Sequence, residues 1–177
     1  MQRKRLCILI EGKEDKLFFD RIVKRILNKK YYPKVFWKYR QKKNEEINEY
    51  LNNEKYKQNA DYIFVTDKDK SPCVSEKKRE KQKELNSLDD PSRIMIVIKE
   101  IDSWYLAGVK DEKWREYGYE PPVTTDKMDK GDIEKIRRKK SMSRIDFLQE
   151  ILDNFDNIEI AKQRNISFKY FIDNYCP

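Results

Sequence analysis

The stretch LCILIEGKEDKLFF, residues 6–19, joins a compact apolar run to an amphipathic one. Leu6–Ile10 is the kind of run that a β-strand buried on both faces requires. Asp15–Leu27 then carries apolar residues at helical spacing, namely Leu17, Phe18, Ile22, Val23, Ile26 and Leu27. The sequence therefore predicts a buried strand that turns at Glu11-Gly12 into a helix.

The same alternation of strand-like and helix-like stretches continues through the first two-thirds of the chain. Further strands are expected at Lys34–Arg40, Asp61–Thr66 and Arg93–Ile98, and helices at Glu45–Tyr56 and Ser103–Val109. This order predicts an α/β fold with a mainly parallel central sheet flanked by helices. In the tail, Ile145, Leu148, Leu152 and Phe155 form one helical stripe, and Ser167 is expected to cap a final helix.

Two segments carry weaker signals. Ser75–Leu88 (SEKKREKQKELNSL) is almost wholly polar, which favours a solvated helix face or a mobile loop over a lysine-rich arm that contacts phosphate. Residues 110–131 hold a Pro-Pro pair and several turn formers, so we expect a long irregular connection there.

Composition excludes several classes of mechanism. The 177 residues include no histidine, so Ser-His-Asp and Cys-His nucleophile systems and histidine-ligated metal sites are ruled out. The three cysteines are widely separated, and Cys7 is best interpreted as a small buried hydrophobe. Lys and Arg outnumber Asp and Glu by 40 to 32, and the resulting net charge of +8 favours a polyanionic partner. The apolar run Leu6–Ile10 is too short for a membrane or signal segment, so we expect a cytoplasmic protein without membrane contact.

Acidic residues follow three of the four expected strands. Glu11 and Asp15 follow the first strand, Asp67 and Asp69 the third, and Glu100 the fourth. The carboxyl ends of parallel strands share one edge of a sheet, so Glu11, Asp67, Asp69 and Glu100 are expected to converge there. A cation is the usual reason to assemble carboxylates, and oxygen ligands without histidine select Mg²⁺ or Mn²⁺.

Such a site suits phosphodiester chemistry, because a bound metal activates water and neutralises developing charge. The lysines beside it, Lys13, Lys68 and Lys70, are candidates to hold phosphate oxygens. Each cluster alone has a simpler interpretation. An acidic residue after a strand is often a helix cap or turn former, which we expect of Asp15, and a lone Asp-x-Asp is more often a surface feature. The conjunction of the clusters favours the metal site.

The order of these motifs resembles that of the Toprim domain, the fold shared by topoisomerases, primases and several small nucleases. LCILIEGKEDKLFF supplies the Glu after the first strand, and DYIFVTDKD supplies the Asp-x-Asp after the third. The resemblance implies that Asp67 and Asp69 bind Mg²⁺, while Glu11 helps to bind metal or acts as general acid or base. VIKEIDSWYLAG is similar to a segment of small Toprim-like proteins allied to the overcoming-lysogenization-defect nucleases, which implies a further acidic site residue at Glu100. DKDKSP departs from the ribosomal-RNA maturation nucleases of the same fold, which carry a proline and a glycine around this motif.

We therefore expect a Toprim-like core over residues 1–110 and a helical C-terminal extension over residues 111–177, packed as one globular unit. The expected activity is that of a metal-dependent nuclease, or related phosphodiester-processing hydrolase, on DNA or RNA, with a protein partner or second copy as a further expectation. The alternative is a non-catalytic Toprim-like module that binds nucleic acid or protein, as in a defence system. A haloacid-like phosphotransferase is set aside, because its nucleophilic Asp should follow the first strand.

Overall fold

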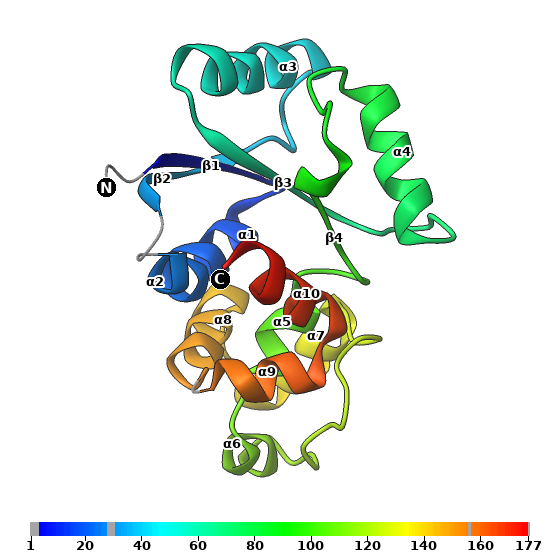
Figure 1. Cartoon of the computed structure of the whole chain (residues 1–177). Coiled ribbons are helices and arrows are strands. Elements are labelled where there is room, and N and C mark those ends of the chain that lie inside the picture. The colour runs from blue at the N-terminus through cyan, green and yellow to red at the C-terminus, as the bar shows by residue number, and fades with distance from the viewer. Residues whose placement is uncertain (1–3, 28–30, 156, 177) are drawn as a thin grey trace. The chain divides into compact units, whose positions relative to one another are not determined.

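The computed structural model describes residues 4–27, 31–155 and 157–176. The chain forms two compact units, Met1–Ile96 and Val97–Pro177 (Figure 1). The expected boundary at residue 110 falls inside the second unit.

The first unit is a four-stranded sheet with helices on both faces. Its elements in chain order are β1 (Lys4–Ile10), α1 (Lys13–Phe18), the π-helical turn η1 (Phe19–Val23), α2 (Lys24–Ile26), β2 (Tyr31–Lys38), α3 (Asn44–Asn52), the π-helical turn η3 (Asn53–Lys57), β3 (Asp61–Asp67), α4 (Val74–Glu84), the 3₁₀ turn η4 (Pro91–Arg93) and β4 (Ile94–Val97). The strand order is β2-β1-β3-β4, and β1 runs parallel to both of its neighbours. The predicted α/β class with a mainly parallel sheet is confirmed.

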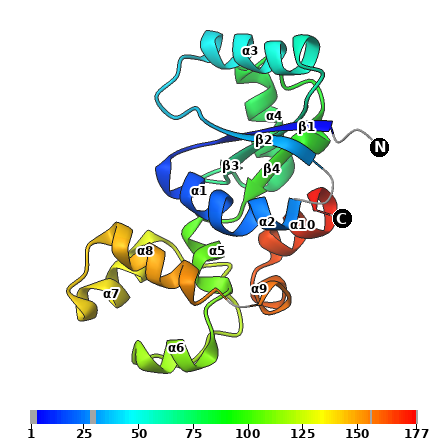
Figure 2. The same cartoon turned by 90° about the vertical axis from the view of Figure 1, so that its left-hand side faces the viewer.

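Side chains alternate between the two faces of the sheet, and both faces are covered. On one face, Cys7 and Leu9 belong to a buried cluster with Ile47 and Leu51 of α3, so the interpretation of Cys7 as a small buried hydrophobe is confirmed. Figures 1 and 2 place α3 and α4 over this face and the α1–α2 stretch over the other. Burial on both faces explains why β1 is a nearly continuous apolar run.

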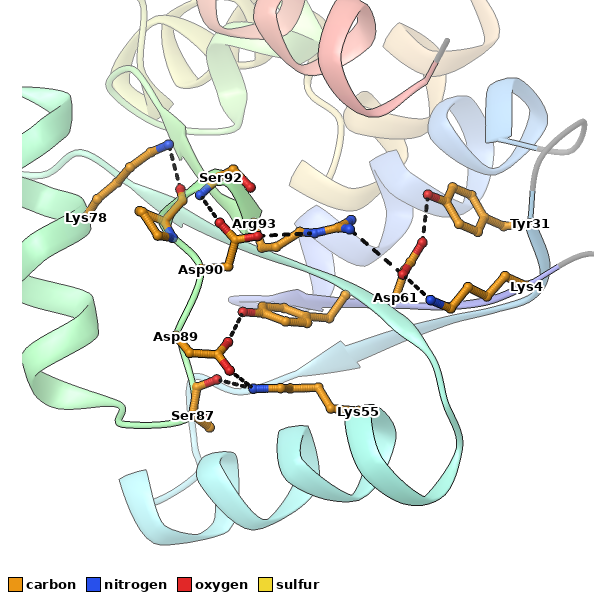
Figure 3. Close-up of polar contacts among 12 residues, drawn as sticks. Lys4, Tyr31, Lys55, Asp61, Lys78, Ser87, Asp89, Asp90, Ser92 and Arg93 are labelled. Carbon is orange, nitrogen blue, oxygen red and sulfur yellow. Dashed lines mark hydrogen bonds and ion pairs between the residues drawn. The ribbon is translucent and has the colours of Figure 1, made fainter.

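Ion pairs close the amino end of the sheet (Figure 3). Asp61, the first residue of β3, accepts a hydrogen bond from Lys4 at 2.7 Å and another from the Tyr31 hydroxyl at 3.2 Å, and Arg93 lies 3.8 Å away. Beside it, Lys55 pairs with Asp89 at 2.6 Å. Each carboxylate at this end therefore faces at least one cation.

Side-chain hydrogen bonds hold the connection between α4 and β4 in place. The Tyr62 hydroxyl donates to Asp89 at 3.0 Å, Lys55 donates to the carbonyl of Ser87 at 3.1 Å, and Lys78 donates to that of Pro91 at 2.8 Å (Figure 3). Ser75–Leu88, for which a solvated helix or a loop was predicted, begins with the helix α4, whose lysines make specific contacts.

The second unit is helical. Its elements are α5 (Asp102–Ala107), α6 (Asp111–Glu116), α7 (Lys130–Lys140), α8 (Arg144–Asp153), α9 (Ile158–Arg164) and α10 (Ile166–Tyr175). Trp104 is fully buried at its centre, and its indole N–H donates to the Ser167 hydroxyl at 2.8 Å. None of the helices in the described part of the chain is long and apolar enough to cross a membrane.

Two local expectations are wrong. The segment 110–131 is not wholly irregular, because α6 forms within it: Asp111 and Glu112 fill its first turn and Trp114 is buried. Ser167 does not cap the last helix. Asn165 does so, because its side-chain oxygen accepts a hydrogen bond from the N–H of Phe168. The Ser167 hydroxyl instead accepts the hydrogen bond from the indole of Trp104.

Candidate active site at the carboxyl end of the sheet

The register of the three parallel strands determines the surroundings of Glu11. Leu9 of β1 pairs with Trp37 of β2 and with Phe64 of β3. Two residues further along, the same register places Glu11 between Tyr39 and Thr66. The β1–β2 ladder continues past the strand ends, because the N–H of Arg40 donates to the carbonyl of Glu11 at 3.2 Å.

The carboxylate of Glu11 is held by neutral donors. Its Oε1 accepts from the Thr66 hydroxyl at 3.2 Å and from the N–H of Asp67 at 3.3 Å, and the Tyr39 hydroxyl lies 3.5 Å away. Tyr39 itself is buried and donates to the carbonyl of Val65 at 2.9 Å. Burial and, after it, the negative charge of Glu11 raise the pKa of Tyr39 well above its usual value, so the hydroxyl stays a donor.

Glu11 therefore has one oxygen committed to the end of β3. Its other oxygen, Oε2, accepts no hydrogen bond from any residue that the structure describes, and the carboxylate forms no ion pair there. A half-exposed carboxylate oriented through one oxygen keeps the second available for a ligand.

Asp67 and Asp69 have different surroundings. Asp67 ends β3, and its backbone lies directly against Glu11. Asp69 has a left-handed backbone with φ of 50°, a conformation that Asp tolerates better than most residues. Its carboxylate is 63% exposed and pairs at 2.6 Å with the ammonium of Lys77, whose side chain is only 7% exposed. Asp67 is therefore brought to Glu11, whereas Asp69 is turned toward α4.

The start of α1 adds a further carboxylate, that of Asp15. Gly12, not Asp15, is the N-cap residue, and Asp15 lies in the first turn with its Oδ2 accepting from the N–H of Gly12 at 2.9 Å. Asp15 is therefore not the N-cap residue itself but completes the capping box from three residues further along the chain. Burial raises the pKa of Asp15 to about 6, the Gly12 N–H opposes this rise, and the charges of Glu11 and Glu14 add to it.

Glu100 belongs to the second unit. There its Oε2 accepts from the N–H of Lys130, the first residue of α7, at 2.9 Å, and its carbonyl accepts from the N–H of Ser103 at 3.0 Å. The first contact ties the entry of α5 to α7, and the second closes the first turn of α5. Within its own unit, Glu100 therefore has a local structural role.

A cationic cleft borders Glu11. Its volume is about 410 Å³, and its lining comprises Glu11, Gly12, Lys13, Lys38, Arg40, Gln41 and Lys42. Four cationic side chains thus line the same cleft as one carboxylate. Of the lysines that were predicted to hold phosphate, Lys13 lines this cleft, Lys68 donates to the carbonyl of Ser71, and Lys70 is exposed in the turn after β3.

The prediction from sequence missed Lys38, Arg40 and Lys42. The signal was available, because KYRQKK, residues 38–43, lies at the end of the second strand, as the acidic motifs lie at the ends of the first and third. The rule that ligands bind beyond the carboxyl ends of strands applies equally to cations.

The donors at this edge partly fit a divalent metal ion. Among residues 4–27, 31–155 and 157–176, no group of three or more acidic, Cys or His side chains is arranged to hold a metal. The backbone of Asp67 nevertheless adjoins the Glu11 carboxylate, and both side chains offer only oxygen. Mg²⁺ is usually bound through one or two carboxylates while it keeps several waters. These two residues would hold the ion, and Asp69 would join them only after leaving Lys77.

Comparison of the chain with protein-family models, with curated proteins and with solved structures finds no match in any of the three. Any function therefore has to be inferred from the residues of this edge.

Proposed function

We propose that the carboxyl edge of the first unit is the active site of a Mg²⁺- or Mn²⁺-dependent, Toprim-like nuclease of the cytoplasm. One observation carries the proposal: Glu11 adjoins Asp67 and at the same time borders a cleft lined by Lys13, Lys38, Arg40 and Lys42. A site for phosphodiester hydrolysis needs oxygen ligands for a metal beside cations for phosphate, and both meet at Glu11.

Each residue has a role in this proposal. Asp67 and Glu11 would hold the metal, which when bound supplies charge neutralisation and an activated water. Glu11 has one available oxygen, Oε2, because its Oε1 is fixed by Thr66. Where Asp67 alone holds the ion, this oxygen would serve as general base instead. The cleft cations would bind backbone phosphates, so the substrate would be recognised without regard to base sequence.

The likeness to the Toprim family supports the same assignment. The Glu after β1 and the Asp-x-Asp after β3 lie on neighbouring parallel strands, as that family's motifs require. We propose Asp69 as an accessory ligand only, since its carboxylate pairs with Lys77. Lys68 and Lys70 would extend the phosphate contacts.

A cleavage assay on the full chain tests the proposal. Labelled single- and double-stranded DNA and RNA are incubated with Mg²⁺ or Mn²⁺ and with the wild-type, Glu11→Gln and Asp67→Asn proteins. We expect metal-dependent products from wild type and a loss of at least about 100-fold in each variant, because each removes metal binding or proton transfer.

Asp61→Asn provides the matched control, because Asp61 opens the same strand that Asp67 ends. This variant should cleave at the wild-type rate. Cleavage that survives Asp67→Asn, or that falls equally in Asp61→Asn without unfolding, would contradict the proposal.

A second candidate function is a non-catalytic nucleic-acid-binding module, and the ion pair between Asp69 and Lys77 favours it. A largely buried lysine that neutralises one of the two aspartates weakens a metal site while leaving the cationic cleft intact. This candidate predicts salt-dependent oligonucleotide binding in EDTA, unchanged by Asp67→Asn and without products. Metal-dependent products would exclude it.

A further inference from the structure

A second cavity of the first unit has the opposite charge. It measures about 630 Å³ and opens beside the edge strand β2, where Trp37 faces α3 and η3. Its charged lining residues are Glu46, Glu49 and Lys57, so acidic groups outnumber basic ones in a chain whose net charge is +8. Carboxylates repel phosphate, so this cavity does not suit a nucleic-acid backbone.

The cavity has a preformed aromatic wall. Trp37 and Tyr50 stack with ring centroids 4.1 Å apart and planes 6° from parallel, and both pack against the buried cluster beneath α3. The Tyr50 hydroxyl lies 3.5 Å from the thiol of Cys7, which anchors the pair to β1. The wall therefore needs no rearrangement to receive a ligand.

Two further side chains favour a cation as that ligand. Tyr56 is 73% exposed, and the ammonium of Lys55 already lies 5.1 Å from its ring centroid, so this ring takes part in cation–π contact. Glu49 is exposed and forms no ion pair with any residue in the described ranges, unlike Glu46, which pairs with Lys42 at 3.1 Å. An aromatic ring beside an uncommitted carboxylate is the environment that binds a guanidinium group.

We propose that this cavity binds an arginine side chain of a basic partner peptide. The planar guanidinium would lie against the aromatic side chains and donate to Glu49, with the amides of Asn52 and Asn53 available to its peptide backbone. A nucleobase is the competing ligand. It is disfavoured because the phosphate attached to a base would meet Glu46 and Glu49.

This inference is independent of the proposed nuclease, because none of its residues belongs to the edge that holds Glu11 and Asp67. It is tested by calorimetric titration of the full chain with a blocked Gly-Arg-Gly peptide. The same peptide with citrulline in place of arginine keeps the shape and loses the charge. We expect the citrulline peptide to bind at least about tenfold more weakly, as loss of a charge-assisted hydrogen bond predicts.

Substitutions in the cavity lining test whether the arginine peptide binds there. Glu49→Gln should weaken the arginine peptide about tenfold and Tyr56→Ala about threefold, in line with the usual strength of such contacts. Glu45→Gln is the matched control, because Glu45 lies on the same helix outside the cavity lining and should have no effect. Fluorescence adds a local readout: Trp104 and Trp114 are buried in the second unit, so the response should come from Trp37 and disappear in Trp37→Phe.

Four outcomes would overturn the proposal. The first is equal binding of the arginine and citrulline peptides. The second is equal loss in Glu49→Gln and Glu45→Gln. The third is displacement of the peptide by adenosine, which would make the cavity a base-binding site. Free argininamide should bind more weakly than the peptide, and equal affinity would contradict a polypeptide as the ligand.

Discussion

The two ends of the sheet in the first unit differ in how their carboxylates are neutralised. At the amino end, Asp61 faces Lys4 and Arg93, and Asp89 faces Lys55 (Figure 3). At the carboxyl end, Glu11 is held by a hydroxyl and a backbone N–H, and its closest polar neighbours are uncharged. The sheet thus begins at carboxylates that form ion pairs and ends at Glu11, which forms no ion pair with any of the described residues.

The pKa values of one carboxyl group at each end show the same contrast. Burial alone would raise the pKa of Asp61, but the hydrogen bond and charge of Lys4 and the charge of Arg93 hold this pKa below its usual value. Asp15, at the other end, has its pKa raised to about 6. A carboxylate paired with cations, like Asp61, stabilises the fold at neutral pH, whereas a carboxyl group with a raised pKa, like Asp15, destabilises it. Groups of the second kind are concentrated at functional sites.

The largest effect on stability is expected from the paired end. Arg5 donates two hydrogen bonds to Glu54, at 2.7 and 2.9 Å, and Glu54 is only 3% exposed. Arg5→Gln would leave a buried carboxylate without its cation and should lower the free energy of unfolding by about 3 kcal/mol. Urea denaturation followed by circular dichroism measures this. Lys13→Gln, an exposed cation at the opposite end, should change stability by less than about 0.5 kcal/mol.

Asp15→Asn should do the reverse and stabilise the fold at neutral pH. Because the folded pKa of about 6 exceeds the unfolded one, the folded state binds more protons, and wild-type stability falls as pH rises from about 4 to 6. Asparagine keeps the acceptor for Gly12 and removes the charge, so the gain above pH 6 should be about 1–3 kcal/mol.

Asp61→Asn, measured in the same unfolding series, should have the opposite effect to Asp15→Asn. The folded pKa of Asp61 is lowered, so its contribution is present above the unfolded pKa and is lost as pH falls through the folded one. Asp61→Asn should therefore destabilise the fold at pH 7 and have little effect in acid. If both variants shift stability in the same direction at pH 7, the two ends do not differ as described.

The smallest effect concerns the cleft. Arg40→Gln should weaken the binding of an oligonucleotide by about fivefold and reduce the slope of log affinity against log salt by about one unit, because one phosphate contact is lost. Fluorescence anisotropy at several salt concentrations measures both quantities. Lys83→Gln, an exposed cation on α4, should change neither.

Periodicity and strand composition were enough to predict the four strands and the parallel sheet, because β1 and β3 are apolar on both faces. The adjacency of Glu11 and Asp67 followed from topology alone. The ion pair between Asp69 and Lys77 could not be predicted in this way, because no local pattern indicates which lysine of a polar helix contacts a neighbouring loop. The raised pKa of Asp15 could not be predicted from sequence either, because it depends on burial beside Glu11 rather than on the types of the neighbouring residues.

The Mn²⁺ affinity of the full chain tests the contrast between the two ends most directly. Electron paramagnetic resonance counts free Mn²⁺ during titration of the wild-type, Asp67→Asn and Asp61→Asn proteins. We expect wild type and Asp61→Asn to bind one ion equally well, and Asp67→Asn to bind it at least about tenfold more weakly, because a carboxylate ligand is lost. Equal Mn²⁺ binding by Asp67→Asn and wild type would contradict a metal site at the carboxyl end.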